Sequence, residues 1–165
     1  MSEPLSAKIF EAFTPDIRAT PLLSLRGGNT LDEYREPEAL DPAIDIVSDD
    51  YLEHYWWGIA FLDPHSWRHY LPYLIEFSLR NKHEHSLVVD ALLTSLRPPD
   101  RQPPRLASLS AAQESVVAAF LDVMAFDEGS VHQTLARTAL EEWWAPGALF
   151  RPGNAGAADV PDRMP

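Results

Sequence analysis

Residues 63–80 read DPHSWRHYLPYLIEFSLR, and this stretch decides the fold. Asp63 suits a helix N-cap, and Pro64 suits the first helical position, where its missing N–H has no partner to lose. Trp67 and Tyr70 then follow at helical spacing, which predicts an apolar helix face turned toward a core.

Pro72 interrupts this helical pattern. Proline lacks the N–H donor and clashes with the preceding turn, so it kinks or breaks a helix. The sequence therefore predicts one short helix ending at Tyr70 and a second from Pro72 to about Arg80.

Other helix starts are marked by serines. A serine precedes an apolar periodic run at four places, and a glutamine three residues after the third and fourth completes a capping box: Ser48, Ser86, Ser110 with Gln113, and Ser130 with Gln133. Together these patterns predict an all-α fold, a compact bundle of about six short helices.

The 165-residue length suits a single domain. We expect one helical domain over residues 1–150. Within it, residues 14–47 are broken by prolines and by a Gly27-Gly28 turn, and they predict an irregular arm over the helical body. Residues 151–165, rich in Gly, Ala and Pro, predict a flexible tail.

The chain is strongly acidic. Its net charge is −12, and residues 1–63 carry thirteen acidic and four basic residues. This charge repels phosphate backbones and anionic membranes, so neither nucleic acid nor a membrane is an expected partner. A basic protein would be attracted, although solubility alone also explains such a charge.

The absence of cysteine excludes disulfides and thiolate chemistry, and it fits a reducing compartment. Glu3 stands where a secretion signal needs positive charge. The longest apolar stretch, residues 116–126, is interrupted by Asp122 and is shorter than the roughly 20 residues of a membrane span. A cytoplasmic location is expected.

Three segments carry a resemblance to a known family. They are Asp63-Pro64-x-x-Trp67-Arg68-x-Tyr70-Leu71-Pro72, Val89-Asp90-x-Leu92-x-x-x-Leu96-x-Pro98-Pro99 and Leu109-x-x-x-Gln113-x-x-x-Val117-x-x-Phe120-Leu121. In this order they resemble a family of small bacterial proteins of unknown function. The resemblance covers residues 48–125 and implies a fold and a bacterial setting, but no activity and no catalytic residues.

His65 and His69 stand four residues apart, a spacing at which both imidazoles can reach one metal ion on a helix. Ser66 occupies the position where metal hydrolases of this pattern carry glutamate. Solvent-exposed helical histidines are the simpler explanation of the pair, because such pairs are common in helices without any ion. The Gly27-Gly28 turn lacks the lysine of a phosphate loop. We therefore expect no metal and no cofactor, with His65 and His69 as the only metal candidates.

Asp90 interrupts an apolar helix face. A carboxylate buried there would need a charge-assisted partner, and Arg68 or Arg80 could supply it. We therefore predict that Asp90 has a structural role, together with Asp63, Pro64, Trp67 and Pro72.

Two pairs of adjacent tryptophans are candidate contact residues. Neighbouring helical side chains point about 100° apart, so both members of a pair are hard to bury against one surface. Exposed tryptophans are typical anchors of protein interfaces. The predicted partner-binding residues are these tryptophans and the acids beside the first pair: Trp56, Trp57, Trp143, Trp144, Asp49, Asp50 and Glu53.

These features favour a non-enzymatic acidic protein that binds a basic protein partner, such as an immunity protein or antitoxin. Charge would speed the encounter and tryptophans would supply the contact energy. Two alternatives remain open. One is a metal-dependent hydrolase that uses His65 and His69, and the other is a homodimeric structural subunit whose tryptophans are buried between the copies.

Overall fold

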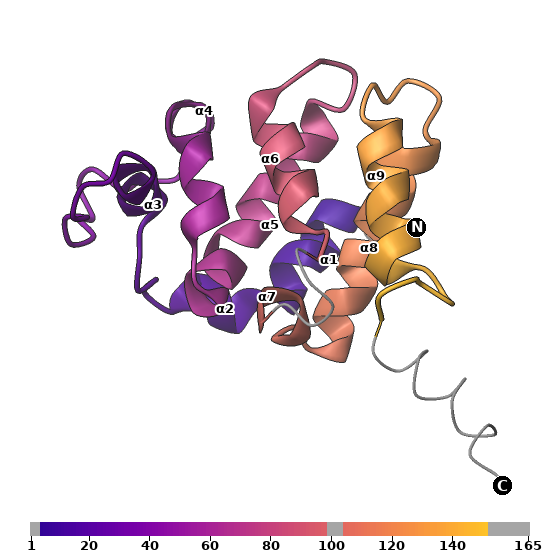
Figure 1. Ribbon diagram of the computed structural model, residues 1–165, viewed down its shortest axis with the longest axis horizontal. Helices are drawn as coiled ribbons and strands as arrows, with labels where there is room; N and C mark the ends of the chain where they lie inside the picture. Colours follow the sequence, from indigo (N-terminus) through magenta and orange to yellow (C-terminus); the bar gives the residue numbers. More distant parts are fainter. Residues whose placement is uncertain (1–3, 99–103, 152–165) are drawn as a thin grey trace, which may run out of the picture.

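A computed structural model describes residues 4–98 and 104–151, and these residues form an all-α fold (Figure 1). The predicted tail lies outside the described residues from position 152 onward. No helix within the described ranges is long and apolar enough to cross a membrane. In chain order the helices are α1 (Leu5–Ala12), α2 (Thr14–Arg18), α3 (Leu25–Asp32), α4 (Asp49–Tyr55), the 3-10 helix η1 (Trp56–Phe61), α5 (Pro64–Arg80), α6 (Leu87–Ser95), α7 (Pro104–Ala107), α8 (Ala111–Phe126), α9 (Gln133–Ala139) and the π-helical segment η2 (Leu140–Trp144).

Helix α5 is the centre of the fold. It starts as the sequence predicts, because the Asp63 side chain accepts a hydrogen bond from the Ser66 N–H at 3.0 Å and Pro64 is its first residue. It packs against α1, α2, α6, α7 and α8. Trp67 is fully buried on its inner face, and the indole Nε1 donates to the Ser95 hydroxyl on α6 at 3.2 Å. The structural roles predicted for Asp63, Pro64 and Trp67 are therefore those seen in the fold.

The predicted break at Pro72 is wrong, because α5 runs unbroken from Pro64 to Arg80. Proline inside a helix costs about 3 kcal/mol. The flanking side chains Leu71, Leu74 and Ile75 are fully buried, and each such burial contributes about 1.5–3 kcal/mol. The apolar burial on both sides of Pro72 outweighs the one missing hydrogen bond.

The predicted irregular arm is also partly wrong, because residues 14–47 include α2 and α3. Pro15 does not prevent α2, since it stands at the start of that helix. The Gly27-Gly28 pair lies inside α3 rather than in a turn. With α7 in the second half of the chain, the described residues contain more helices than the six predicted.

The glycines of α3 allow a backbone-to-backbone contact with η1. A Cβ atom on Gly28 would lie 2.5 Å from the Gly58 carbonyl oxygen, and one on Gly58 would lie 2.2 Å from the Leu25 carbonyl oxygen. Neither position has room for a side chain. Gly58 lies within η1, where it makes this contact.

The capping predictions hold at three of four serines. Ser48 and Ser86 cap α4 and α6, and Ser110 forms the predicted capping box with Gln113. The fourth is wrong: α9 starts at Gln133 with His132 as its N-cap, and the Ser130 hydroxyl donates to the Met124 carbonyl at 2.7 Å. Ser130 thus closes the turn after α8 instead of starting α9.

The contact between Gly28 and Gly58 predicts that Gly28→Ala destabilises the fold, the opposite of what helix propensity predicts. Helix propensity alone would make Gly28→Ala stabilising by about 1 kcal/mol. We expect it to lower the free energy of unfolding by about 3 kcal/mol, because the new methyl group meets backbone that cannot move aside. Urea unfolding followed by circular dichroism measures the change.

Gly27→Ala is the matched control for Gly28→Ala. A Cβ atom on Gly27 would meet the Leu23 Cδ1 atom at 2.8 Å, which is the movable tip of a side chain. We expect its effect to stay within about 1 kcal/mol. Equal effects of the two substitutions would show that the close approach of α3 and η1 is not a constraint on the fold.

Candidate functional site

The surface beside the Gly28–Gly58 contact carries the first tryptophan pair. The α4 helix tightens into η1 at Trp56, and the Trp56 and Trp57 rings stack with centroids 4.0 Å apart and planes 26° apart. Trp57 is 53% exposed, whereas Trp56 is half-buried. The predicted exposure of this pair is thus correct for Trp57 and partly so for Trp56.

Two hollows flank Trp56. The larger one, of about 650 Å³, lies between η1 and α6, and its walls include Trp56, Trp57, Asp90 and Arg105. The smaller one, of about 310 Å³, lies on the other side of Trp56 and is lined by residues that include Glu53, Glu84 and the exposed Leu87. We call the surface made by Asp50, Glu53, Trp56, Trp57, Glu84 and Leu87 the tryptophan face.

The acidic residues of the tryptophan face have no basic partner among the described residues. Asp50, Glu53 and Glu84 are exposed, and none forms an ion pair in residues 4–98 or 104–151. Asp49 differs from them, because Arg80 on α5 donates to its carboxylate at 2.8 Å and 3.1 Å. Those hydrogen bonds hold the pKa of Asp49 below its ordinary value. Asp49 therefore fixes α4 to α5, while Asp50 and Glu53 remain available.

Two nearby bases, Lys82 and Arg97, are already paired with carboxylates. Lys82 lies 3.2 Å from Asp127, and the guanidinium of Arg97 binds Glu142 through two nitrogens at 2.8 Å and 2.9 Å. These basic side chains are therefore not available to neutralise the acids of the tryptophan face.

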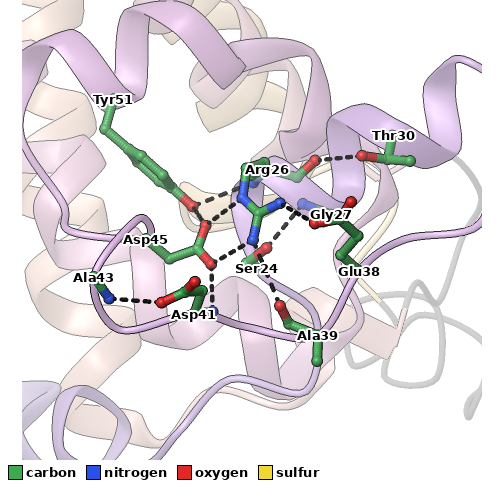
Figure 2. A network of polar contacts seen from close by, with 10 residues as sticks. All are labelled: Ser24, Arg26, Gly27, Thr30, Glu38, Ala39, Asp41, Ala43, Asp45 and Tyr51. Carbon is green, nitrogen blue, oxygen red and sulfur yellow. Dashed lines mark hydrogen bonds and ion pairs between the residues drawn. The ribbon is translucent and has the colours of Figure 1, made fainter.

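A buried ion pair that the sequence did not reveal holds the chain before α4 in place (Figure 2). The guanidinium of Arg26 on α3 donates twice to the Asp45 carboxylate, from Nε and Nη2 at 3.0 Å each. The Tyr51 hydroxyl on α4 donates to the same carboxylate at 2.7 Å, and the Asp41 N–H does so at 2.8 Å. The Asp45 side chain is fully buried. Its hydrogen bonds connect α3, the 33–48 segment and α4.

The network sets the protonation of its members. Burial opposes ionisation of Asp45, but the hydrogen bonds from Arg26, the Asp41 backbone and Tyr51 outweigh it and hold its pKa below the ordinary value. Burial raises the pKa of Tyr51, with the neighbouring Tyr70 and the Asp45 carboxylate acting in the same direction. Tyr51 thus stays a neutral donor, and Asp45 stays an anion.

The second tryptophan pair is not exposed, which removes the reason for predicting Trp143 and Trp144 as partner-binding residues. Both indoles are buried, and Trp144 Nε1 donates to the Leu96 carbonyl at 2.7 Å. The guanidinium of Arg151 covers the Trp143 ring at 4.8 Å. Trp143 and Trp144 do not point 100° apart as in an α-helix, because the chain forms a wider π turn at Leu140–Trp144 and both rings face the core.

Asp90 is not the buried residue that the sequence predicts. Its side chain is 50% exposed, and Asp90 Oδ1 lies 3.5 Å from Nδ1 of the buried His132, not near Arg68 or Arg80. Arg68 binds Asp16 at 3.0 Å and Arg80 binds Asp49. Asp90 sits at the edge of the apolar surface of α6, where water solvates half of it.

His65 and His69 both contact backbone carbonyls. Nε2 of His65 lies 3.0 Å from the Thr20 oxygen, and Nδ1 of His69 lies 2.9 Å from the Asp16 oxygen. Each imidazole thus ties α5 to α2 or to the chain after it. The described residues contain no group of three or more histidines and acids placed to hold a metal ion.

The family of the chain was determined by comparison with known proteins. A family model described as a family of unknown function, DUF6714, matches residues 1–148. The chain belongs to this family. The resemblance to a family without assigned activity is therefore confirmed, and it extends beyond residues 48–125 to the N-terminal helices and to η2. No curated protein and no solved structure matches the chain.

The Arg26–Asp45 pair predicts a pH-dependent stability. The pKa of Asp45 is lower in the folded state than in the unfolded state, so its contribution is complete above the unfolded value of about 4 and is lost as pH falls through the lower folded value. At pH 7 we expect Asp45→Asn to lower the free energy of unfolding by about 2–3 kcal/mol, because Arg26 loses its buried counter-charge.

Urea titrations of both proteins from pH 7 to pH 3 measure this prediction. The difference between wild type and Asp45→Asn should shrink below about pH 4. Glu33→Gln is the control, since the Glu33–Arg35 pair is exposed and should contribute less than about 0.5 kcal/mol. A difference that stays constant down to pH 3 would contradict the assigned role of the Asp45 charge.

Proposed function

We propose that this chain is a non-enzymatic binding protein that holds a basic protein partner on its tryptophan face. The observation that supports the proposal is the exposed Trp57, stacked on Trp56, which shares a hollow with Glu53 and Glu84, two acids without partners among the described residues. Asp50 and Glu53 are one helical turn apart on α4, and Glu84 shares a hollow with Glu53 and Trp56.

Trp57 supplies the apolar part of the interface. A large ring that remains half exposed in the free protein gains free energy when a partner covers it. Its stacking on Trp56 fixes the orientation of the ring before binding, which reduces the entropy lost on association. The exposed Leu87 beside the smaller hollow extends this apolar area.

The acids supply the attraction and the choice of partner. Opposite charge on a partner raises the association rate, and like charge rejects acidic proteins. The chain charge of −12 acts in the same direction over a screening length of about 10 Å at 0.1 M salt. A partner with lysines or arginines around an apolar patch fits this surface.

We propose that this binding protein acts as an immunity protein or antitoxin in a bacterial cytoplasm. Such a protein must bind tightly and quickly to one basic partner, and a charged rim around an aromatic anchor provides both properties. The absence of cysteine fits a reducing compartment. The hydrolase alternative is weakened, because His65 and His69 are both engaged by backbone carbonyls.

The test starts with a photo-crosslinking residue in place of Leu87, introduced into cells of the source organism, followed by purification and sequencing of the crosslinked protein. Association and dissociation rates of the recovered partner are then measured by surface plasmon resonance at 50 mM and 300 mM salt. We expect a basic partner whose association slows with salt. An acidic partner, a second copy of this chain, or an association rate that ignores salt would contradict the proposal.

Two variants separate the roles of ring and charge. We expect Trp57→Ala to weaken binding about 30-fold, mostly through faster dissociation, because the anchor is lost. We expect Glu53→Lys to slow association several-fold at low salt and less at high salt. Tyr34→Ala and Asp122→Lys are the controls: Tyr34 is 99% exposed outside the face, and Asp122 lies on α8. Equal effects of the control substitutions on the two rates would show that the tryptophan face is not where the partner binds.

A further inference from the structure

Arg105 on α7 has an unusual environment. Its Nη1 donates to the Ile59 carbonyl at 3.1 Å, and its guanidinium lies 5.8 Å from the centre of the Trp67 ring. No carboxylate of the described residues lies within ion-pair distance of it. Burial lowers its pKa from the ordinary value, and no charged neighbour among those residues offsets this.

Arg105 differs from the other arginines that are not exposed, because those bind carboxylates. Within the described ranges, five arginines are not exposed, and four of them bind a carboxylate: Arg26 binds Asp45, Arg68 binds Asp16, Arg97 binds Glu142 and Arg151 binds Glu114. Arg105 is the fifth. Since a guanidinium stays charged in proteins, a partly buried one without a counter-charge is costly, and a bound anion would lower that cost.

Arg105 opens onto the larger hollow beside the tryptophan face. Within the described residues, the Ile59 carbonyl is the one hydrogen-bond acceptor of its guanidinium. The volume of about 650 Å³ is that of a typical small-molecule site. Trp56, Trp57, Ala91 and Pro98 line the same hollow and give it apolar surface.

The other charged groups of the hollow limit the ligand to one negative charge. Arg97 also lines it but is bound to Glu142 through two nitrogens, so Arg105 is the cation left for a ligand among the described lining residues. Asp90 lines the same hollow and repels a second negative charge. A phosphate dianion therefore suits the hollow less well than a carboxylate, whose plane matches the fork of a guanidinium.

We propose that this hollow binds a small aromatic monocarboxylate, with its carboxylate on Arg105 and its ring against the Trp56–Trp57 wall. The ring gains apolar burial and stacking, and the carboxylate supplies the counter-charge that Arg105 lacks. This site goes beyond the proposed partner binding, since it uses Arg105 and the inside of the hollow rather than the acids Asp50 and Glu53.

The first experiment uses the unmodified full-length protein. Isothermal titration calorimetry compares 2-naphthoate with 2-naphthamide, and indole-3-acetate with indole-3-acetamide. We expect at least one acid to bind, and its neutral amide to bind at least about tenfold more weakly, because the charge-assisted bonds to Arg105 are lost. No binding of either acid at 5 mM, or equal binding of an acid and its amide, would overturn the proposal.

The second experiment assigns the site. We expect Arg105→Gln to reduce acid binding about tenfold or more and Arg105→Lys to retain part of it. Arg137→Gln should change nothing, because Arg137 is exposed, lies outside the hollow and has no carboxylate partner within residues 4–98 and 104–151. Thermal unfolding checks that each variant is folded; should Arg105→Gln not fold, the acid–amide comparison decides alone. Unchanged binding in a folded Arg105→Gln would overturn the assignment.

Peptide binding is tested separately. A tetrapeptide ending in tryptophan, compared as free acid and as amide, tests whether the carboxylate on Arg105 belongs to a peptide C-terminus and not to a small molecule. Binding of the peptide acid without binding of naphthoate or indole-3-acetate would overturn the small-molecule assignment. Glu53→Lys should leave acid binding intact and Arg105→Gln should leave partner association intact, so either proposal can fail without the other.

Discussion

The close approach of two glycines fixes the part of the fold on which the site depends. Gly28 of α3 and Gly58 of η1 touch through their backbones, with the Gly58 carbonyl oxygen 2.5 Å from where a Cβ atom of Gly28 would lie. Because α3 cannot come so near to any larger residue, this contact determines where η1 lies. The Trp56–Trp57 pair at the start of η1 is presented as a consequence. The Arg26–Asp45–Tyr51 network then holds α4 from the other side (Figure 2).

Helix α5 connects this arrangement to both proposed binding sites. Trp67 is fully buried at its centre, bonded to Ser95 of α6 on one side and lying beneath the Arg105 guanidinium on the other. Trp67 of α5 therefore contacts α6 and supports the cation in the hollow between η1 and α6. A surface for a basic partner and a site for a carboxylate can be neighbours because their charges are separate: Glu53 and Glu84 line the smaller hollow, and Arg105 lines the larger one.

The sequence predicted those features that depend on neighbours in the chain. The caps at Ser48, Asp63, Ser86 and Ser110 are local bonds between a side chain and the next turn, so their residue types were sufficient. It could not predict that Asp45 meets Arg26, that Trp143 and Trp144 are buried through a π turn, or that Gly28 meets Gly58. Each of these depends on a partner far along the chain or on a helix type without a sequence signal. One hint was present, because Arg26 is one of four bases among the first 63 residues and therefore has many acids to choose from.

The central claim is that the glycine contact sets the tryptophan pair at the surface, and fluorine NMR of 5-fluorotryptophan-labelled protein tests it most directly. The chain has five tryptophans, so the spectrum is simple to assign by single Trp→Phe variants. We expect the Trp57 signal to show the largest shift between H2O and D2O, and the buried Trp67, Trp143 and Trp144 to show little. In Gly28→Ala, the Trp56 and Trp57 signals should move while those of Trp143 and Trp144 keep their positions. Unchanged Trp56 and Trp57 signals in that variant, or a solvent shift at Trp143 or Trp144 as large as at Trp57, would contradict the account.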